Sequence, residues 1–156
     1  MRQFVFALES LFQVKQTVRD KLQAEYAAAQ AALAEAEDEK ARLDRTLAEE
    51  SGRYARKART GTTIGDFEAH AIYFEELQRM ISAAGRRVDR AREEAVRRQT
   101  ALVEVHKEIK VLEKLRRKRH LEHRAEEARR ELGVREDILS FHMAGGADTP
   151  GRPAGS

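Results

Sequence analysis

An apolar seam through the second half of the chain constrains its fold more than any other feature. Two rows of residues each recur every seven positions, the second row three residues behind the first, and only His70 and Arg98 are polar. The rows are Phe67, Phe74, Ile81, Val88, Ala95, Leu102, Ile109 and His70, Leu77, Ala84, Ala91, Arg98, Val105, Leu112. Spacings that alternate between three and four keep both rows on one stripe of a helix that winds around a partner helix.

The first half of the chain offers that partner helix. Its seam begins with Phe4, Leu8, Leu11, Lys15, Val18 and Leu22, thickened by Phe6, Phe12 and Val14, and continues as Leu22, Tyr26, Ala29, Leu33, Ala36, Lys40, Leu43, Leu47, Glu50 and Tyr54. Two consecutive spacings of four meet at Leu22, and they predict a stutter that locally unwinds the supercoil. The pattern predicts one helix over residues 5–58.

The segment RTGTTIG at residues 59–65 is the internal place where the chain can turn. Gly61 and Gly65 tolerate unusual backbone angles, and Thr63 and Asp66 have the spacing of a capping box. A second helix should then run over residues 66–140, and a short connection makes the two helices antiparallel neighbours.

We therefore predict an all-α fold in which two long helices form an antiparallel coiled-coil hairpin over residues 1–141. A disordered tail should follow over residues 142–156, because this segment is rich in Gly, Pro and Ala and contains both prolines of the chain.

The charge pattern gives an independent test of this hairpin. If the chain folds near residue 63, residue i lies opposite roughly residue 126 − i. Phe4 should then lie opposite about residue 122. The acidic run should lie beside a basic one, with Glu35, Glu37, Asp38 and Glu39 facing Arg86, Arg87, Arg90 and Arg92.

Composition and motifs argue against enzymatic chemistry. The chain has no Cys, which excludes thiol catalysis and Cys-based zinc sites, and it has no glycine-rich phosphate loop. His120 and His123 share a helix face, but no third metal ligand accompanies them. Carboxylates on a two-helix rod lack the pocket that catalysis needs. We expect no enzyme activity, no cofactor, no metal and no small-molecule substrate.

The N-terminal residues do not form a signal peptide, and no run approaches the roughly 20 apolar residues that span a bilayer. The chain should therefore be soluble.

The segment KLRRKRHLEHR at residues 114–124 holds six basic residues and one acidic residue. Three readings are open: a solvated helix face, a surface that docks onto an acidic protein, or one that binds nucleic-acid phosphates. A leucine-zipper DNA binder carries its basic region before its heptads, whereas here the order is reversed. We therefore rank an acidic protein partner above nucleic acid.

Three segments together resemble the flagellar export protein FliJ family. The opening FVFALESLFQVKQ matches the family pattern, the segment FEAHAIYFEELQRMI resembles the start of its second helix, and EIKVLEKLRRKRHLEHRAEEARRELGVREDI is similar to its C-terminal signature. The Gly/Pro-rich tail departs from the pattern. The resemblance implies a non-enzymatic, stalk-like antiparallel coiled coil of the flagellar type III export apparatus.

The resemblance also implies partners and a location. Members engage the hexameric export ATPase ring with their terminal end and the membrane export gate near the turn, and they escort export chaperones. Such a protein would be cytoplasmic and peripherally associated with the inner face of the cell membrane at the flagellar base. Carried onto this chain, the ATPase-binding residues are Phe4, Leu8, Leu11, Leu115, Arg116, Arg117, Arg119 and Arg124, and the gate-binding residues are Tyr54, Tyr73, Leu77 and Met80.

The residues alone leave two alternatives open. One is a generic coiled-coil scaffold or dimeric tether that contacts nucleic acid through its basic C-terminal helix. The other is a swapped dimer, because the same seams could be satisfied between two chains.

Overall fold

A computed structural model describes residues 2–146 of the chain. Helix α1 spans Glu9–Thr60 and helix α2 spans Ile64–Gly146, and no strand occurs among the described residues. The predicted all-α fold of two long packed helices is confirmed. Helix α2 runs beyond its predicted end at residue 140, and residues 147–156 of the predicted tail lie outside the described residues.

The first helix begins four residues later than predicted. Residues 2–6 form a non-helical arm, and the backbone N–H of Glu9 donates to the carbonyl of Phe6 at 3.0 Å. The arm carries an aromatic, β-branched, aromatic sequence with modest helix propensity. Because Phe6 is only 7% exposed, the arm gains more from packing than from another helical turn.

The turn has the chemistry that the sequence predicts. Gly61 adopts a positive φ of 109°, which L side chains rarely tolerate, and it follows the last residue of α1. Thr63 Oγ1 accepts a hydrogen bond from the backbone N–H of Asp66 at 3.1 Å, which is the capping interaction expected at the start of α2.

The chain divides into two compact units, which we describe separately. The hairpin unit comprises residues Val14–Glu108, and the terminal unit combines the N-terminal residues through Gln13 with the chain from Ile109 onward.

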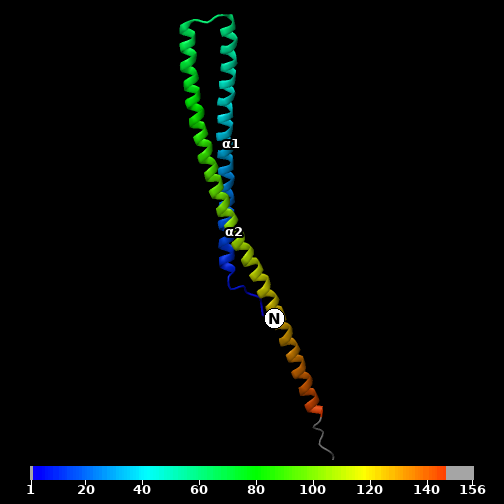
Figure 1. Cartoon of the computed structure of the whole chain (residues 1–156). Coiled ribbons are helices and arrows are strands. Elements are labelled where there is room, and N and C mark those ends of the chain that lie inside the picture. Colours follow the sequence, from blue (N-terminus) through cyan, green and yellow to red (C-terminus); the bar gives the residue numbers. More distant parts are fainter. Residues whose placement is uncertain (1, 147–156) are drawn as a thin grey trace, which may run out of the picture. The chain divides into compact units, whose positions relative to one another are not determined.

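In the hairpin unit α1 and α2 lie side by side and are joined at one end by the short turn (Figure 1). The seam is the core of this unit, and the side chains that it buries are Ala29, Leu77, Ala84, Val88, Ala95 and Val105. Phe67 is an exception at 56% exposed, because α1 ends at Thr60 and offers little for it to pack against.

Ion pairs between the helices confirm the antiparallel register. Arg87 Nη2 lies 2.9 Å from Glu39 and Arg92 Nη2 lies 3.3 Å from Glu37, as the charge pattern predicts. Lys15 and Glu108 meet at 2.5 Å near the other end of the unit. These side chains are about half exposed, so the pairs mark the register while burial of the seam stabilises it.

The predicted stutter at Leu22 is wrong. Lys15 and Arg19 are partly buried on the seam of the hairpin unit, whereas Val14 and Val18 are 56% and 38% exposed. The row Lys15, Arg19, Leu22, Tyr26 and Ala29 keeps alternating spacings of four and three without a shift. The long apolar stems of Lys and Arg can lie along the seam while their charged ends reach water, so polar residues hold positions that apolarity alone would assign to their neighbours.

In the terminal unit the arm and the start of α1 pack against α2. Phe12 is 5% exposed and Phe6 7%, and the α2 residues Ile109 and Leu112 are also buried. The ring of Phe4 lies 4.9 Å from that of His120 and 5.6 Å from that of His123, which confirms its predicted place opposite about residue 122.

Candidate partner-binding surfaces

Of the four arginines predicted to bind the ATPase, one is engaged within the chain and three are not. Arg116 Nε lies 3.5 Å from Glu9 Oε2, and its guanidinium lies 5.5 Å from the ring centre of Phe12. Glu9 Oε2 is buried without a hydrogen bond, so Arg116 compensates its charge. Within the described part of the chain, Arg117, Arg119 and Arg124 are exposed and form no ion pair.

Apolar side chains of the arm and the start of α1 accompany these cations. Val5 is 81% exposed, Leu11 43% and Leu8 37%. The arm and α2 enclose a hollow of about 300 Å³, with Phe4 and Leu8 on one side and Leu115, Arg119 and His123 on the other.

All eight residues predicted for ATPase binding therefore belong to the terminal unit. Phe6 and Phe12, which the prediction omits, are the buried aromatic side chains there.

An aromatic cluster lies beside the turn in the hairpin unit. The rings of Tyr54 and His70 stack with centres 3.9 Å apart and planes 11° from parallel. Phe67 approaches Tyr54 at 6.4 Å, and Phe74 approaches His70 at 5.8 Å. This cluster joins the end of α1 to the start of α2 and gives the turn end a rigid base.

Three of the four residues predicted for gate binding can be reached by a partner. Tyr73 and Met80 are each 43% exposed, and Tyr54 is half-buried in the aromatic cluster. Leu77 is only 3% exposed because it belongs to the seam, so we withdraw it as a contact residue.

The structure adds apolar residues that the sequence reasoning missed at this end. Ile64 is 79% exposed, Ile72 68% and Phe67 56%. Phe67 was not predicted to be exposed because it was assigned to the seam. Ile64 was not predicted because it falls within the predicted turn. The available signal was the end of α1 at the turn, because α1 has no residues beyond it against which these side chains could pack.

Hydrogen bonds shift the pKa of two exposed carboxyl groups. Hydrogen bonds from Thr63, with help from Lys57, hold the pKa of Asp66 below its ordinary value. Hydrogen bonds from Arg97 and Arg98 lower the pKa of Glu94. These are pairs that support helix ends and register, and none lies in an enclosed site of the kind that tunes a catalytic group.

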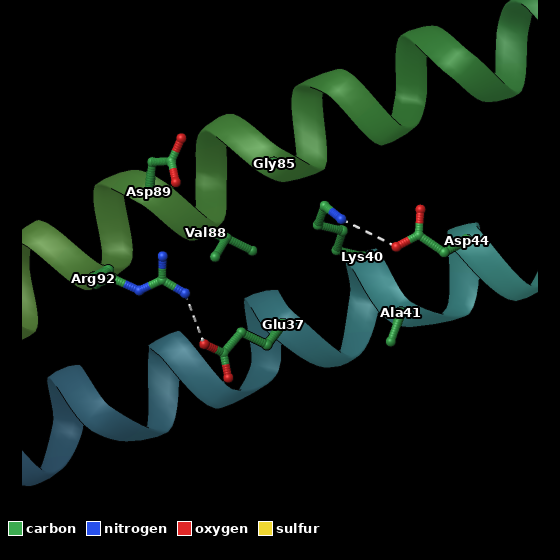
Figure 2. Close-up of a pocket in the computed structure, with 8 residues that line it drawn as sticks. All are labelled: Glu37, Lys40, Ala41, Asp44, Gly85, Val88, Asp89 and Arg92. Carbon is green, nitrogen blue, oxygen red and sulfur yellow. Dashed lines mark hydrogen bonds and ion pairs between the residues drawn. The ribbon is translucent and has the colours of Figure 1, made fainter.

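A groove of about 490 Å³ lies between the helices in the middle of the hairpin unit (Figure 2). Four of its five charged side chains pair with one another, Arg92 with Glu37 at 3.3 Å and Lys40 with Asp44 at 3.1 Å. Gly85 leaves room for the Lys40 stem. No group of three or more His, Cys, Asp or Glu side chains that could hold a metal ion occurs among the described residues.

The chain matches the family described as Flagellar FliJ protein over residues 4–132. The chain belongs to the FliJ family. The matched range contains the arm, both helices of the hairpin unit and the basic segment. Membership of the FliJ family makes the chain a non-enzymatic component of the flagellar protein export apparatus.

No curated protein and no solved structure matches the chain. Neither FliJ-like helix, over the residues that the structure describes, is apolar enough along its length to cross a membrane.

Proposed function

We propose that the chain is a coupling stalk of flagellar export, which binds the export ATPase ring through its terminal unit and the export gate membrane protein through its turn end. One observation supports this most: Arg117, Arg119 and Arg124 are exposed and, in the part of the chain that the structure describes, lack ion pairs, in the same unit as the exposed Leu8 and Leu11. A surface that combines cations with apolar side chains is typical of protein interfaces, in which Arg is enriched.

The turn end supports the second half of the proposal. Tyr73 is exposed next to the Tyr54 and His70 stack, and Met80 is exposed further along α2. Aromatic and Met side chains are enriched at protein interfaces, and a Tyr ring loses little conformational entropy when it is bound.

In this role the chain works in the cytoplasm, at the inner face of the membrane at the flagellar base. There it also escorts export chaperones. The proposal needs no cofactor and no small-molecule substrate.

The terminal unit can be tested by charge reversal. The variant R117E/R119E/R124E should bind the purified export ATPase at least about tenfold more weakly, because each reversal replaces attraction by repulsion. A matched control is R45E/R86E/R90E, which reverses three exposed arginines of the hairpin unit. Helicity should be unchanged in both, as measured by circular dichroism. Equal affinity of the two variants and the parent would contradict the role of the terminal arginines.

The same arginines support the rival scaffold that contacts nucleic acid. Duplex DNA binding that is tighter than ATPase binding and falls steeply with salt would favour this rival. We expect only weak DNA binding, because the apolar Leu8 and Leu11 beside the cations do not suit a phosphate backbone.

A further inference from the structure

The turn end carries a concentration of positive charge. Residues 53–67, which we call the tip, contain four basic residues and one acidic residue. The basic residues all lie on the last turns of α1, within the sequence RYARKAR. The tip is therefore cationic, although acidic residues predominate in the earlier part of α1.

Two of these cations have no partner among the residues that the structure describes. Arg53 pairs with Glu50, and Lys57 pairs with Asp66 at 3.4 Å. Arg56 and Arg59, in contrast, are exposed and form no ion pair there. Their charges are available to an external anion.

Exposed apolar side chains lie next to these cations. Ile64 is 79% exposed and Phe67 56%, and both belong to the first turn of α2. The turn between the helices is made of the small, uncharged residues Gly61, Thr62 and Thr63. The apolar side chains are thus presented beside the turn and are not covered by charged groups of the turn itself.

We propose that the tip docks onto the surface of a bilayer that contains anionic lipid. Ile64 and Phe67 enter the boundary between headgroups and acyl chains, while Arg56 and Arg59 contact lipid phosphates. Neither signal is sufficient alone, because two apolar side chains anchor weakly and a few cations are screened by salt. Together they combine the hydrophobic and cationic contributions by which peripheral segments bind membranes.

A lipid surface fits these observations better than an acidic protein. The apolar and cationic side chains occupy a convex turn, and a fluid interface can surround such a shape without a complementary partner site. Its negative potential complements the net positive charge of the tip.

The absence of Trp from the chain makes the test direct, because a single introduced Trp reports on one position. In Phe67→Trp, fluorescence should shift to the blue on adding vesicles of phosphatidylcholine with phosphatidylglycerol, and brominated acyl chains should quench it. Vesicles of phosphatidylcholine alone should give no shift. Leu8→Trp places the reporter in the terminal unit, where we expect no quenching.

Binding should also depend on the charges of the tip. Cosedimentation with the anionic vesicles should weaken about 25-fold in R56Q/R59Q, at about fivefold for each cation removed. The control R86Q/R90Q, which removes two exposed arginines outside the tip, should change binding little. Thr62→Trp alone should be quenched by the brominated chains, and T62W/I64S/F67S should not be quenched although its helices remain folded.

Three results would overturn the proposal. The first is that the fluorescence of Phe67→Trp does not change when anionic vesicles are added. The second is that Leu8→Trp responds to the vesicles and Phe67→Trp does not. The third is that R56Q/R59Q and R86Q/R90Q bind the vesicles equally well. If the parent does not bind vesicles and R56Q/R59Q no longer binds the gate, the partner of the tip would instead be an acidic protein. The vesicle assay contains neither ATPase nor gate, so its failure would leave the coupling role standing.

Discussion

At the scale of single residues, Arg98 shows how the seam accommodates a charge. Its guanidinium donates to Glu25 on α1 and to Glu94 on α2, each at 2.8 Å. The carboxylates raise the pKa of Arg98 further above its ordinary value, Glu94 contributing most. A polar contact at one seam position penalises slipped registers, in which the charge would meet apolar neighbours. The sequence marks Arg98 as an exception but does not identify its partner, because Glu25 lies about one turn from the residue expected opposite.

Acid should destabilise the hairpin through Asp66 and Glu94. Both carboxyl groups have a folded pKa below the ordinary values of 3.8 and 4.5. Their contribution is complete above the unfolded pKa and is lost as the pH falls through the folded pKa. The melting temperature should therefore decrease below about pH 4.5, and less so in Asp66→Asn/Glu94→Gln. The same acid-induced decrease in this variant and the parent, followed by circular dichroism, would refute the assignment.

Two glycines should respond oppositely to alanine. A Cβ at Gly85 would lie 3.8 Å from Lys40 Cε, an ordinary contact, so Gly85→Ala should stabilise by about 0.5–1 kcal/mol through helix propensity. At Gly61, φ is 109°, so Gly61→Ala should destabilise by about 1 kcal/mol. Urea unfolding of both variants measures the difference, and a stabilised Gly61→Ala would show that the turn differs from the one described.

At the scale of the elements, the first helix shows which structural features a heptad pattern predicts and which it does not. The turn, the cap at Thr63 and the antiparallel pairing could be predicted because each depends on local chemistry or on charge patterns along the chain. The non-helical arm could not be predicted, and neither could the absence of the stutter. They depend on whether Phe12 or Leu11 is buried against α2, and on how well Lys15 and Arg19 lie along a seam. That competition is decided by tertiary packing.

Adjacent substitutions should therefore differ sharply. Phe12→Ala removes an aromatic side chain that is 5% exposed and should cost about 3 kcal/mol or somewhat more. Leu11→Ala removes a side chain that is 43% exposed and should cost less than about 1 kcal/mol. Denaturant unfolding of the two variants distinguishes the registers, and a larger cost at Leu11 would restore the register with the stutter.

At the scale of the whole molecule, the seams are satisfied within one chain. Pairs such as Arg87 with Glu39 join α1 to α2 of the same chain. We expect a monomer in light scattering and a melting temperature that does not change over a roughly hundredfold range of concentration. A dimeric mass with a concentration-dependent melting temperature would support the swapped dimer.

The candidate surfaces were only partly predictable from sequence. Family resemblance assigned Tyr73, Met80 and the terminal arginines, which the structure leaves exposed. It also assigned Leu77, which is buried, and it missed Ile64, because accessibility follows from where α1 ends and not from residue type.

The central claim is that one chain joins the ATPase ring to the gate, and a bridging assay tests it most directly. The cytoplasmic part of the gate is immobilised, and capture of the export ATPase is measured with and without the chain. We predict capture only when the chain is present, and its loss in both R117E/R119E/R124E and Tyr73→Ser/Met80→Ser. In separate binding assays each variant should keep the partner of its unaltered end. Capture that is independent of the chain, or that survives both variants, would contradict the coupling role.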